Sequence, residues 1–421
     1  MTNKIQISKS NRTNKAVLKI FLALLIVSIW FGCNSQQKQQ DQKPYLVVLS
    51  MDGFKWDYTD KVNTPNFDKI AQQGVKAKSM IPSFPTKTFP NHYTLATGLY
   101  PDHHGIVLNG FYDPIEDRHY RVGNRDAVSD GSFYGGEPIW VTAEKQGVKS
   151  ASLFWVGSEA EIKGLRPSIW KTYEHKMPYG NRIDTVISWL ELPGPRRPHL
   201  IMWYFDEPDS EGHHSGPDGL KTFETIERLD SLLGVFLHKL EQLPIANQVN
   251  FIVTSDHGMC ATKDDRVVML NEFIQEEWIE EIQGNSPIWT IKAKPEFKDD
   301  LANKLSTIEH ITAWPSAEVP ERLHYGKNPR TLDFVAVADS AWSLFYDKKG
   351  SYYGGAHGYD NKNTDMHAIF YGTGPMFKNN YFQTTFPNVS LYPLMCEILN
   401  LQAAPNDGNL KEVEGMLKLK E

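Results

Sequence analysis

Acidic side chains follow three apolar runs of this sequence, each near the point where the run ends. Asp52 follows YLVVLSM, Asp209 lies shortly after LIMWYF, and Asp256 lies just beyond NFIVTS. Such runs are typical of buried parallel strands, whose carboxyl ends meet at one edge of the sheet. A single strand-end acid is usually only a turn residue. Three acids on one edge would repel one another unless cations bound among them.

Histidines accompany these acids. His257 directly follows Asp256, and His213 lies four residues after Asp209, so one helical turn would direct both members of the second pair the same way. His357 lies between glycines in GGAHGYD, where we expect a loop with little reason to be buried. Mixed Asp and His ligands suit zinc well and manganese less well. Together with Asp52, these side chains predict two divalent-metal sites, each with three protein ligands and an open position.

The stretch KTFPNHYTLATG (87–98) places a lone hydroxyl, Thr88, at the start of a predicted helix. Pro90 suits the first turn, and Gly98 can end the helix in the left-handed conformation. Thr88 could simply cap this helix. Beside bound metal ions, its hydroxyl would lose its proton more readily and could attack phosphorus, while the helix N–H groups would face the phosphate. We therefore predict that Thr88 is a nucleophile.

The elements that must position these residues alternate between strand and helix. This alternation predicts an α/β fold with a mostly parallel central sheet and helices on both faces. The segment from about 290 to 345 is mixed and charged, and it predicts a small inserted α+β subdomain. Apolar runs at 45–51, 151–156, 200–205, 250–255 and 368–374 predict buried parallel strands, and the clearest helices span 66–74 and 223–243.

The N-terminus differs from the rest of the chain. Residues 1–19 carry five basic side chains and no acid, and the apolar run IFLALLIVSIWFG then leads to Cys33 and a polar tether. This pattern resembles a bacterial lipoprotein signal, so we expect a signal peptide at 1–32, a lipid anchor on Cys33, a tether at 33–43 and a catalytic domain at 44–421. An uncleaved anchor with an incidental cysteine is the alternative. We expect the two remaining cysteines, Cys260 and Cys396, to be buried thiols.

Six segments occur in the order seen in nucleotide pyrophosphatase/phosphodiesterases of the alkaline phosphatase superfamily, which this chain resembles from about residue 44 to its end. They are MDGFKWDY, TPNFDKIAQQGV, FPTKTFPNHYTLATGLYPDHHGI, EPDSEGHHSGP, TSDHGM and GAHGYD. The resemblance implies two Zn²⁺ ions per chain and a phosphothreonine intermediate on Thr88. Asn109 and the Thr88 N–H would bind phosphate oxygens. One ion would be held by Asp209, His213 and His357, and the other by Asp52, Asp256 and His257, with Thr88 bound to the second.

The resemblance also implies a slot of aromatic side chains that stacks a nucleobase, formed by Phe89, Tyr173 and Tyr204. Core packing is the alternative role of these rings. Stacking tolerates any base, so it predicts no base preference. Three further histidines lie in the same motifs; we expect His214 to neighbour the site, and His92 and His104 to be structural.

The predicted function is hydrolysis, outside the cytoplasm, of phosphodiester or pyrophosphate bonds in small nucleotides, with release of a nucleoside monophosphate. The net charge of −7 gives no sign of binding to nucleic-acid polymers, and nothing implies a partner protein. Sulfatases share the superfamily fold but require C-x-P-x-R, whereas this chain has TFPNH. A phosphomonoesterase would need additional positive groups. A lysophospholipid or choline phosphodiesterase of the same family and a non-catalytic nutrient-binding lipoprotein are the remaining alternatives.

Overall fold

The computed structural model describes residues 43–347 and 353–418. The expected signal peptide, Cys33 and nearly all of the polar tether lie outside these residues. Among the residues described, no helix is both long and apolar enough to cross a membrane. The chain from Pro44 onward forms one compact unit.

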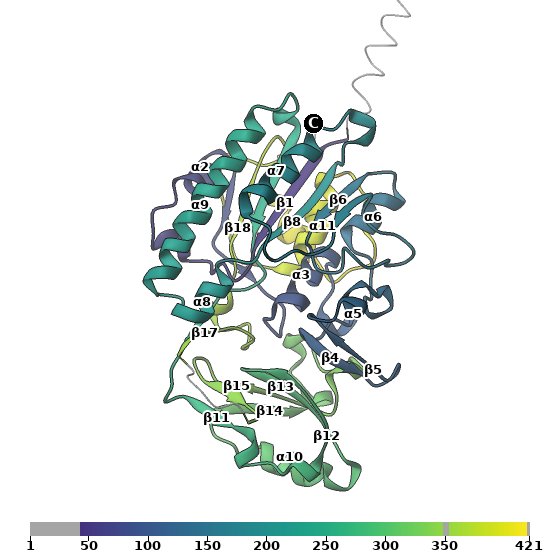
Figure 1. The fold of residues 1–421 in the computed structure, drawn as a ribbon, viewed down its shortest axis with the longest axis vertical. Helices are drawn as coiled ribbons and strands as arrows, with labels where there is room; N and C mark the ends of the chain where they lie inside the picture. The colour runs from purple at the N-terminus through teal and green to yellow at the C-terminus, as the bar shows by residue number, and fades with distance from the viewer. Residues whose placement is uncertain (1–42, 348–352, 419–421) are drawn as a thin grey trace, which may run out of the picture. The chain divides into compact units, whose positions relative to one another are not determined.

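An eight-stranded sheet lies at the centre of this unit, in the order β19-β2-β18-β9-β1-β8-β6-β7. Most neighbouring strands in it run parallel, and helices cover both of its faces (Figure 1). The predicted α/β fold class is therefore confirmed. The strands are β1 (Tyr45–Met51), β2 (Val75–Ala77), β6 (Ser150–Leu153), β7 (Ile169–Lys171), β8 (Leu200–Phe205), β9 (Val249–Thr254), β18 (Phe370–Thr373) and β19 (Tyr381–Gln383).

Two strand predictions need correction. The run at 368–374 forms β18, which pairs antiparallel with both β9 and β2, so its prediction as a parallel strand was wrong. The strand predicted at 151–156 ends at Leu153, because Phe154 has a φ of 76° and turns the chain out of the sheet. The residues after this turn face a pocket rather than a neighbouring strand.

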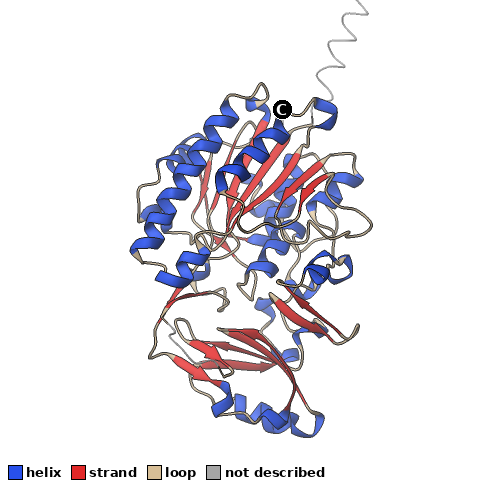
Figure 2. Ribbon diagram, in the orientation of Figure 1, coloured by secondary structure: helices blue, strands red, loops and turns tan. Residues whose placement is uncertain are grey.

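Side chains of β1 alternate between two hydrophobic cores. Val47 and Leu49 face the core under α2 (Pro65–Gln73), α7 (Tyr179–Leu190) and α9 (Leu220–Glu241). Leu46 and Val48 face the opposite core, which is covered by α3 (Thr88–Thr97), α6 (Ile139–Lys145) and α11 (Leu391–Ile398). Figure 2 shows these helices on either side of the central strands. A strand that is buried on both faces reads as a continuous apolar run, as β1 does.

A second sheet is built from a later part of the chain, in the order β12-β13-β15-β14, and is antiparallel throughout. It begins at Ile279, earlier than the charged segment that suggested an insertion. Its own core includes Ile291, Leu301 and Phe334. Its elements are β12 (Ile279–Asn285), β13 (Ile288–Ala293), α10 (Lys298–Leu305), β14 (Ile311–Pro315) and β15 (Phe334–Ala338).

Shorter elements connect the two sheets and border the site. The helices are α4 (Pro101–His104), α5 (Arg125–Ser129) and α8 (Asp209–Ser215). The strand pairs are β3 (Met80–Ile81) with β20 (Phe386–Pro387), β4 (Gly110–Asp113) with β5 (Arg118–Arg121), β10 (Cys260–Thr262) with β17 (Gly354–Ala356), and β11 (Val267–Met269) with β16 (Ser343–Phe345).

Cys260 and Cys396 are free and buried, as predicted. Burial raises the pKa of each thiol to about 12. Neither side chain is therefore a reactive thiolate near neutral pH.

Candidate active site

The carboxyl ends of three strands carry the predicted acidic residues to one place. Asp52 follows β1, Asp256 follows β9 after one serine, and Asp209 begins α8 shortly after β8. Ligand atoms of Asp209, His213 and His357 all lie within 4.8 Å of one another, and we call this group the Asp209 trio. Ligand atoms of Asp52, Asp256 and His257 meet the same limit and form the Asp52 trio. The structure thus brings together the two sets of three residues that the family resemblance implied.

The three imidazoles of these trios are oriented by the main chain. Nδ1–H of His257 donates to the carbonyl of Gly258 (2.9 Å), Nδ1–H of His213 donates to Gly355 (2.8 Å), and Nδ1–H of His357 donates to Thr86 (2.8 Å). A carbonyl can only accept, so Nδ1 is the protonated nitrogen in all three rings. Each Nε2 then offers a lone pair to its trio, which is how histidine ligands are usually held.

Carboxylate oxygens in the trios are buried without a hydrogen-bond donor. Asp52 Oδ1, Asp209 Oδ1 and Asp256 Oδ2 accept no hydrogen bond. Imidazole Nε2 atoms, which carry no proton in this arrangement, lie 3.4, 3.7 and 3.0 Å from these oxygens, respectively. Leaving buried acceptors unpaired is costly, and a bound cation would remove this cost. The donor set of carboxylate oxygens and imidazole nitrogens fits zinc.

Close packing between the trios requires a glycine after Asp52. Gly53 has a φ of 67°, and a Cβ at this position would lie 2.9 Å from the backbone and side chain of Asp209. The Gly53 N–H also donates to Asp256 Oδ1 (3.1 Å). The dipeptide Asp52-Gly53 therefore lets all three carboxylates approach one another.

The crowded charges shift the pKa values of these groups. Burial, together with the negative charges of Asp256 and Asp209, raises the pKa of Asp52 well above its usual value. Burial opposes ionisation of Asp256 as well, but the neighbouring His257 and His92 outweigh it and hold the pKa of Asp256 well below normal. Asp52 is thus the carboxylate that most needs a positive neighbour.

His357 differs from the sequence expectation. Instead of lying in an exposed loop, it follows strand β17, and only 4% of its surface is exposed. Burial and the charges of His257 and Lys87 lower the pKa of His357 well below its usual value, which favours the neutral imidazole that can bind a metal.

Thr88 is the first residue of α3, and the helix ends at Gly98 in the left-handed conformation, as predicted. The N-cap residue is Lys87, and no side-chain hydrogen bond caps this end, so the capping role considered for Thr88 is wrong. The Thr88 hydroxyl instead lies 3.3 Å from Nε2 of His257, at the edge of the Asp52 trio.

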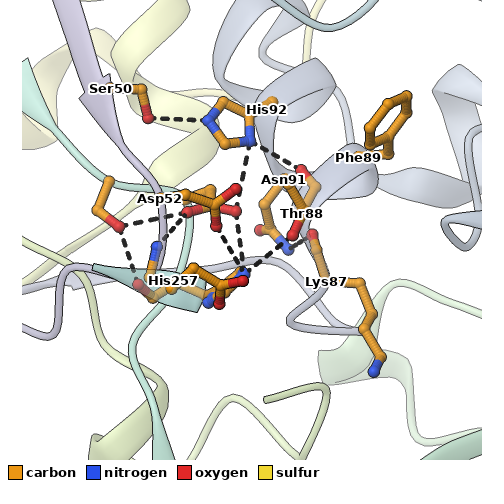
Figure 3. A network of polar contacts seen from close by, with 12 residues as sticks. Ser50, Asp52, Lys87, Thr88, Phe89, Asn91, His92 and His257 are labelled. Atoms are coloured by element: carbon orange, nitrogen blue, oxygen red, sulfur yellow. Dashed lines mark hydrogen bonds and ion pairs between the residues drawn. The ribbon is translucent and has the colours of Figure 1, made fainter. Parts of the chain in front are cut away.

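Two buried side chains after Thr88 hold the start of α3 in place. The Asn91 amide donates to the carbonyls of Pro85 (3.0 Å) and Lys87 (2.9 Å). His92 donates from Nδ1 to the Thr88 carbonyl (2.9 Å), and its Nε2 accepts from the Ser50 hydroxyl (2.9 Å). Figure 3 shows His92 between Ser50 and the cluster that contains Asp52, Thr88 and His257. His92 is therefore a structural residue of the site.

Asn109 lies beside the start of α3. Its Oδ1 accepts a hydrogen bond from the Phe89 N–H (2.9 Å), so the orientation of the side-chain amide is known and Nδ2 is left as a donor. The Thr88 N–H is at the first helical position, where backbone donors have no acceptor within the helix. Two donors can thus serve one anion next to the Thr88 hydroxyl.

An aromatic pocket of about 250 Å³ opens at Thr88, and we call it the Phe89 pocket. It contains all three predicted slot residues. Tyr173 is 36% exposed, so it is not simply part of the core. Tyr204 also donates its hydroxyl to Asp52 Oδ2 (2.5 Å), which connects the pocket to the Asp52 trio. The pocket is lined by Thr88, Phe89, Val122, Arg125, Val128, Tyr134, Phe154, Trp155, Val156, Gly157, Glu159, Tyr173 and Tyr204.

Sequence reasoning missed several residues of this pocket. Arg125 and Glu159 form an ion pair within its lining, and Glu159 Oε1 also accepts from the Tyr173 N–H (2.9 Å). Both residues come from segments without a recognisable motif. The turn at Phe154, which starts the segment containing Trp155, was hidden inside an apolar run that resembles a strand.

The other two histidines from the motifs belong to neither trio. His104 is buried, accepts from the Ile106 N–H (3.1 Å) and bonds the Thr94 hydroxyl (3.0 Å). Burial lowers the pKa of His104 to about 3, so it is a neutral structural residue. His214 follows His213 on α8 and is exposed.

Residues 46–360 match the family described as Type I phosphodiesterase / nucleotide pyrophosphatase. The match covers most of the chain and includes both trios. The chain belongs to this family.

Similarity to individual members of the phosphodiesterase/nucleotide pyrophosphatase family extends over nearly the whole chain. This chain is 37% identical over 404 residues to rat ectonucleotide pyrophosphatase/phosphodiesterase family member 3. The match covers 92% of this chain but only 46% of the rat protein. It is 35% identical over 407 residues to human family member 5, covering 96% and 83% of the two chains. A solved structure of murine family member 5, an inactive threonine-to-alanine variant in complex with AMP, has a TM-score of 0.86 and 35% identity, and the match covers 90% of this chain and 100% of that one.

Proposed function

We propose that this protein is a two-zinc phosphodiesterase and nucleotide pyrophosphatase that acts through a phosphothreonine intermediate and releases a nucleoside monophosphate. The observation that carries the proposal is the convergence of two Asp/His trios, with oriented imidazoles and unpaired carboxylate oxygens, beside the Thr88 hydroxyl. Residues 44–421 would act as one catalytic domain, with the second sheet as an insertion.

The Asp209 trio and the Asp52 trio would each hold one zinc ion. Bound zinc supplies positive charge that lowers the pKa of a neighbouring hydroxyl and stabilises negative charge on phosphate oxygens. The trios would place these charges at the carboxyl edge of the central sheet, beside the Thr88 hydroxyl.

Thr88 would perform the first displacement. Its hydroxyl loses a proton to solvent, its Oγ forms a bond to phosphorus, and the bond from phosphorus to the leaving oxygen breaks in line with it. Asn109 Nδ2 and the Thr88 N–H would donate to the equatorial oxygens, where negative charge is held in the transition state. Water then attacks the phosphothreonine from the opposite side, the Thr88 oxygen leaves and takes up a proton, and nucleoside monophosphate is released.

The Phe89 pocket supports a nucleotide substrate over a choline phosphodiester. A quaternary ammonium group is recognised by aromatic rings together with available negative charge. Glu159, which supplies a carboxylate to the pocket lining, is engaged by Arg125 and by the Tyr173 N–H, so its charge is largely neutralised. A flat, uncharged nucleobase suits such a lining better. AMP is the molecule bound in the murine family member 5 structure.

The test is hydrolysis of p-nitrophenyl thymidine monophosphate by the zinc-loaded protein. We expect chelation to abolish activity and zinc to restore it, and Thr88→Ala to lower kcat by at least about 10⁴-fold. Thr88→Ser, which keeps a hydroxyl, is the matched control and should retain much more activity. In support, the inactive murine variant also carries alanine in place of a threonine.

Two outcomes would favour the alternatives. Release of phosphocholine in preference to nucleoside monophosphate would indicate a lysophospholipid or choline phosphodiesterase of the same family. Nucleotide binding without turnover, with Thr88→Ala indistinguishable from the wild type, would indicate a binding protein.

We further infer that the protein is exported and anchored to a bacterial membrane through a lipid on Cys33. The support is the basic, apolar and cysteine pattern of residues 1–33. The substrate would be a small molecule in the periplasm or outside the cell.

A further inference from the structure

A second pocket, of about 460 Å³, lies on the side of the site formed by the second sheet, and we call it the Trp289 pocket. It shares no lining residue with the Phe89 pocket. It reaches the proposed metal centre through His213, whose side chain is 43% exposed. The lining residues that matter here are His213, Asn285, Ser286, Trp289, Phe345 and Tyr346.

The Trp289 pocket lies at the far end of a row of histidines that begins at Thr88. The Thr88 hydroxyl is 3.3 Å from His257 Nε2, and the rings of His257 and His357 stack at 3.6 Å. The ring of His213 comes next, 5.0 Å from that of His357. The row therefore leads from the nucleophile, across both trios, to the lining of the Trp289 pocket.

The geometry of in-line displacement predicts which part of the substrate lies at each end of this row of histidines. The leaving oxygen departs from phosphorus on the side opposite to the attacking oxygen. Because Thr88 is at the Asp52 trio, the leaving oxygen must depart over the Asp209 trio, where His213 borders the second pocket. We propose that the Trp289 pocket binds the leaving group, while the Phe89 pocket binds the part of the substrate that stays on phosphorus. This inference rests on the proposed function.

The lining of the Trp289 pocket favours a flat aromatic leaving group. The indole of Trp289 is fixed because its Nε1–H donates to the Leu344 carbonyl (2.8 Å). Phe345 and Tyr346 add rings from β16 and its end, and Asn285 offers amide groups at the end of β12. Asp347 also lines the pocket, so the lining carries a carboxylate in addition to rings and an amide. The aromatic rings could stack on a nucleobase, and the Asn285 amide could form hydrogen bonds with it, so this lining suits a second nucleoside.

The hairpin that carries this pocket is tied to the residue before the nucleophile. Lys87 is buried, and its Nζ donates to the carbonyl of Ser286 (2.8 Å) in the turn between β12 and β13. The start of α3 and the Trp289 pocket therefore share a direct contact. A substrate held in both pockets would span the two sheets across the metal centre.

The test compares two substrates that differ only in the leaving group: a dinucleoside monophosphate and the methyl ester of the same nucleoside monophosphate. Trp289→Leu should lower kcat/KM for the dinucleoside monophosphate by about tenfold and leave the methyl ester unchanged, because only the former would stack on the indole. Trp314→Leu is the matched control: Trp314 lies in β14 of the same sheet but does not line the pocket. It should leave both rates unchanged. Equal loss for both substrates with Trp289→Leu, or no loss for either, would overturn the assignment.

A binding measurement separates this inference from the proposed function. Calorimetry with zinc-loaded Thr88→Ala should show Kd for the intact dinucleoside monophosphate weakened about tenfold by the added Trp289→Leu change, with Kd for the nucleoside monophosphate unchanged. An unaltered dinucleoside Kd would reject the pocket assignment even in a protein without hydrolytic activity. Failure of the proposed function would show itself differently, as absence of hydrolysis of either substrate by the wild type.

Discussion

Asn109 offers a direct test of how the site stabilises negative charge. Its Oδ1 accepts from the Phe89 N–H at 2.9 Å, which identifies the other amide atom, Nδ2, as the donor that could bind a phosphate oxygen. The two halves of this amide therefore have separable roles. Oδ1 holds the side chain to the start of α3, and Nδ2 would act on the substrate.

Two substitutions separate these roles. Asn109→Ala removes both, and we expect a fall in kcat of about 10²- to 10³-fold, corresponding to about 3–4 kcal/mol of transition-state stabilisation. It should also lower the free energy of unfolding by about 1 kcal/mol, because the Phe89 N–H loses its acceptor. Asn109→Asp keeps an acceptor for Phe89 but puts a negative charge where a donor stood. Its stability should stay close to that of the wild type, while its activity falls at least as far as that of the alanine variant.

The assay is steady-state hydrolysis of p-nitrophenyl thymidine monophosphate, together with urea unfolding of each variant. The expected pattern is loss of activity in both variants and loss of stability in Asn109→Ala alone. If Asn109→Asp hydrolysed the substrate at the wild-type rate, the side chain would act only by holding α3. Asn109 would then have no part in stabilising negative charge on the substrate.

Two further predictions concern stability and location. Burial lowers the pKa of His104 to about 3, below the value of about 6.5 expected in the unfolded chain. The contribution of this neutral histidine to stability is therefore present above about pH 6.5 and is lost as the pH falls. Between pH 6.5 and 5, this group alone should reduce the free energy of unfolding by about 2 kcal/mol. His104→Gln, which cannot titrate, should show a correspondingly smaller loss in urea unfolding at the two pH values, and an equal loss would contradict the assignment. Cys33→Ser should move the protein from the membrane fraction to the soluble fraction on cell lysis, and retention in the membrane fraction would favour an uncleaved anchor.

The metal-ligand candidates could be predicted because their positions follow from local rules. Acids directly after apolar strands must lie at the carboxyl edge of a parallel sheet. The spacing of Asp209 and His213 matches one helical turn, and α8 provides that turn. Gly98 and Pro90 marked the extent of α3 for equally local reasons.

Features that depend on distant parts of the chain could not be predicted in this way. The direction of β18 depends on the whole path from β9 through the second sheet, which no local pattern records. His357 is buried, and the acceptor for its Nδ1–H is the carbonyl of Thr86, far away in the sequence. The pairing of Arg125 with Glu159, and the turn at Phe154 that brings Trp155 into the pocket lining, are likewise tertiary features.

The acceptors that orient the three imidazoles belong to Thr86, Gly258 and Gly355, and all three are carbonyl oxygens. Every amino acid has this group, so no side-chain replacement can delete it. Exchanges at these positions act on ligand direction only by bending the peptide path. The orientation of the rings is therefore as resistant to mutation as the backbone path of these three segments. Proline insertion into those segments would disturb the orientation more than loss of any neighbouring polar side chain.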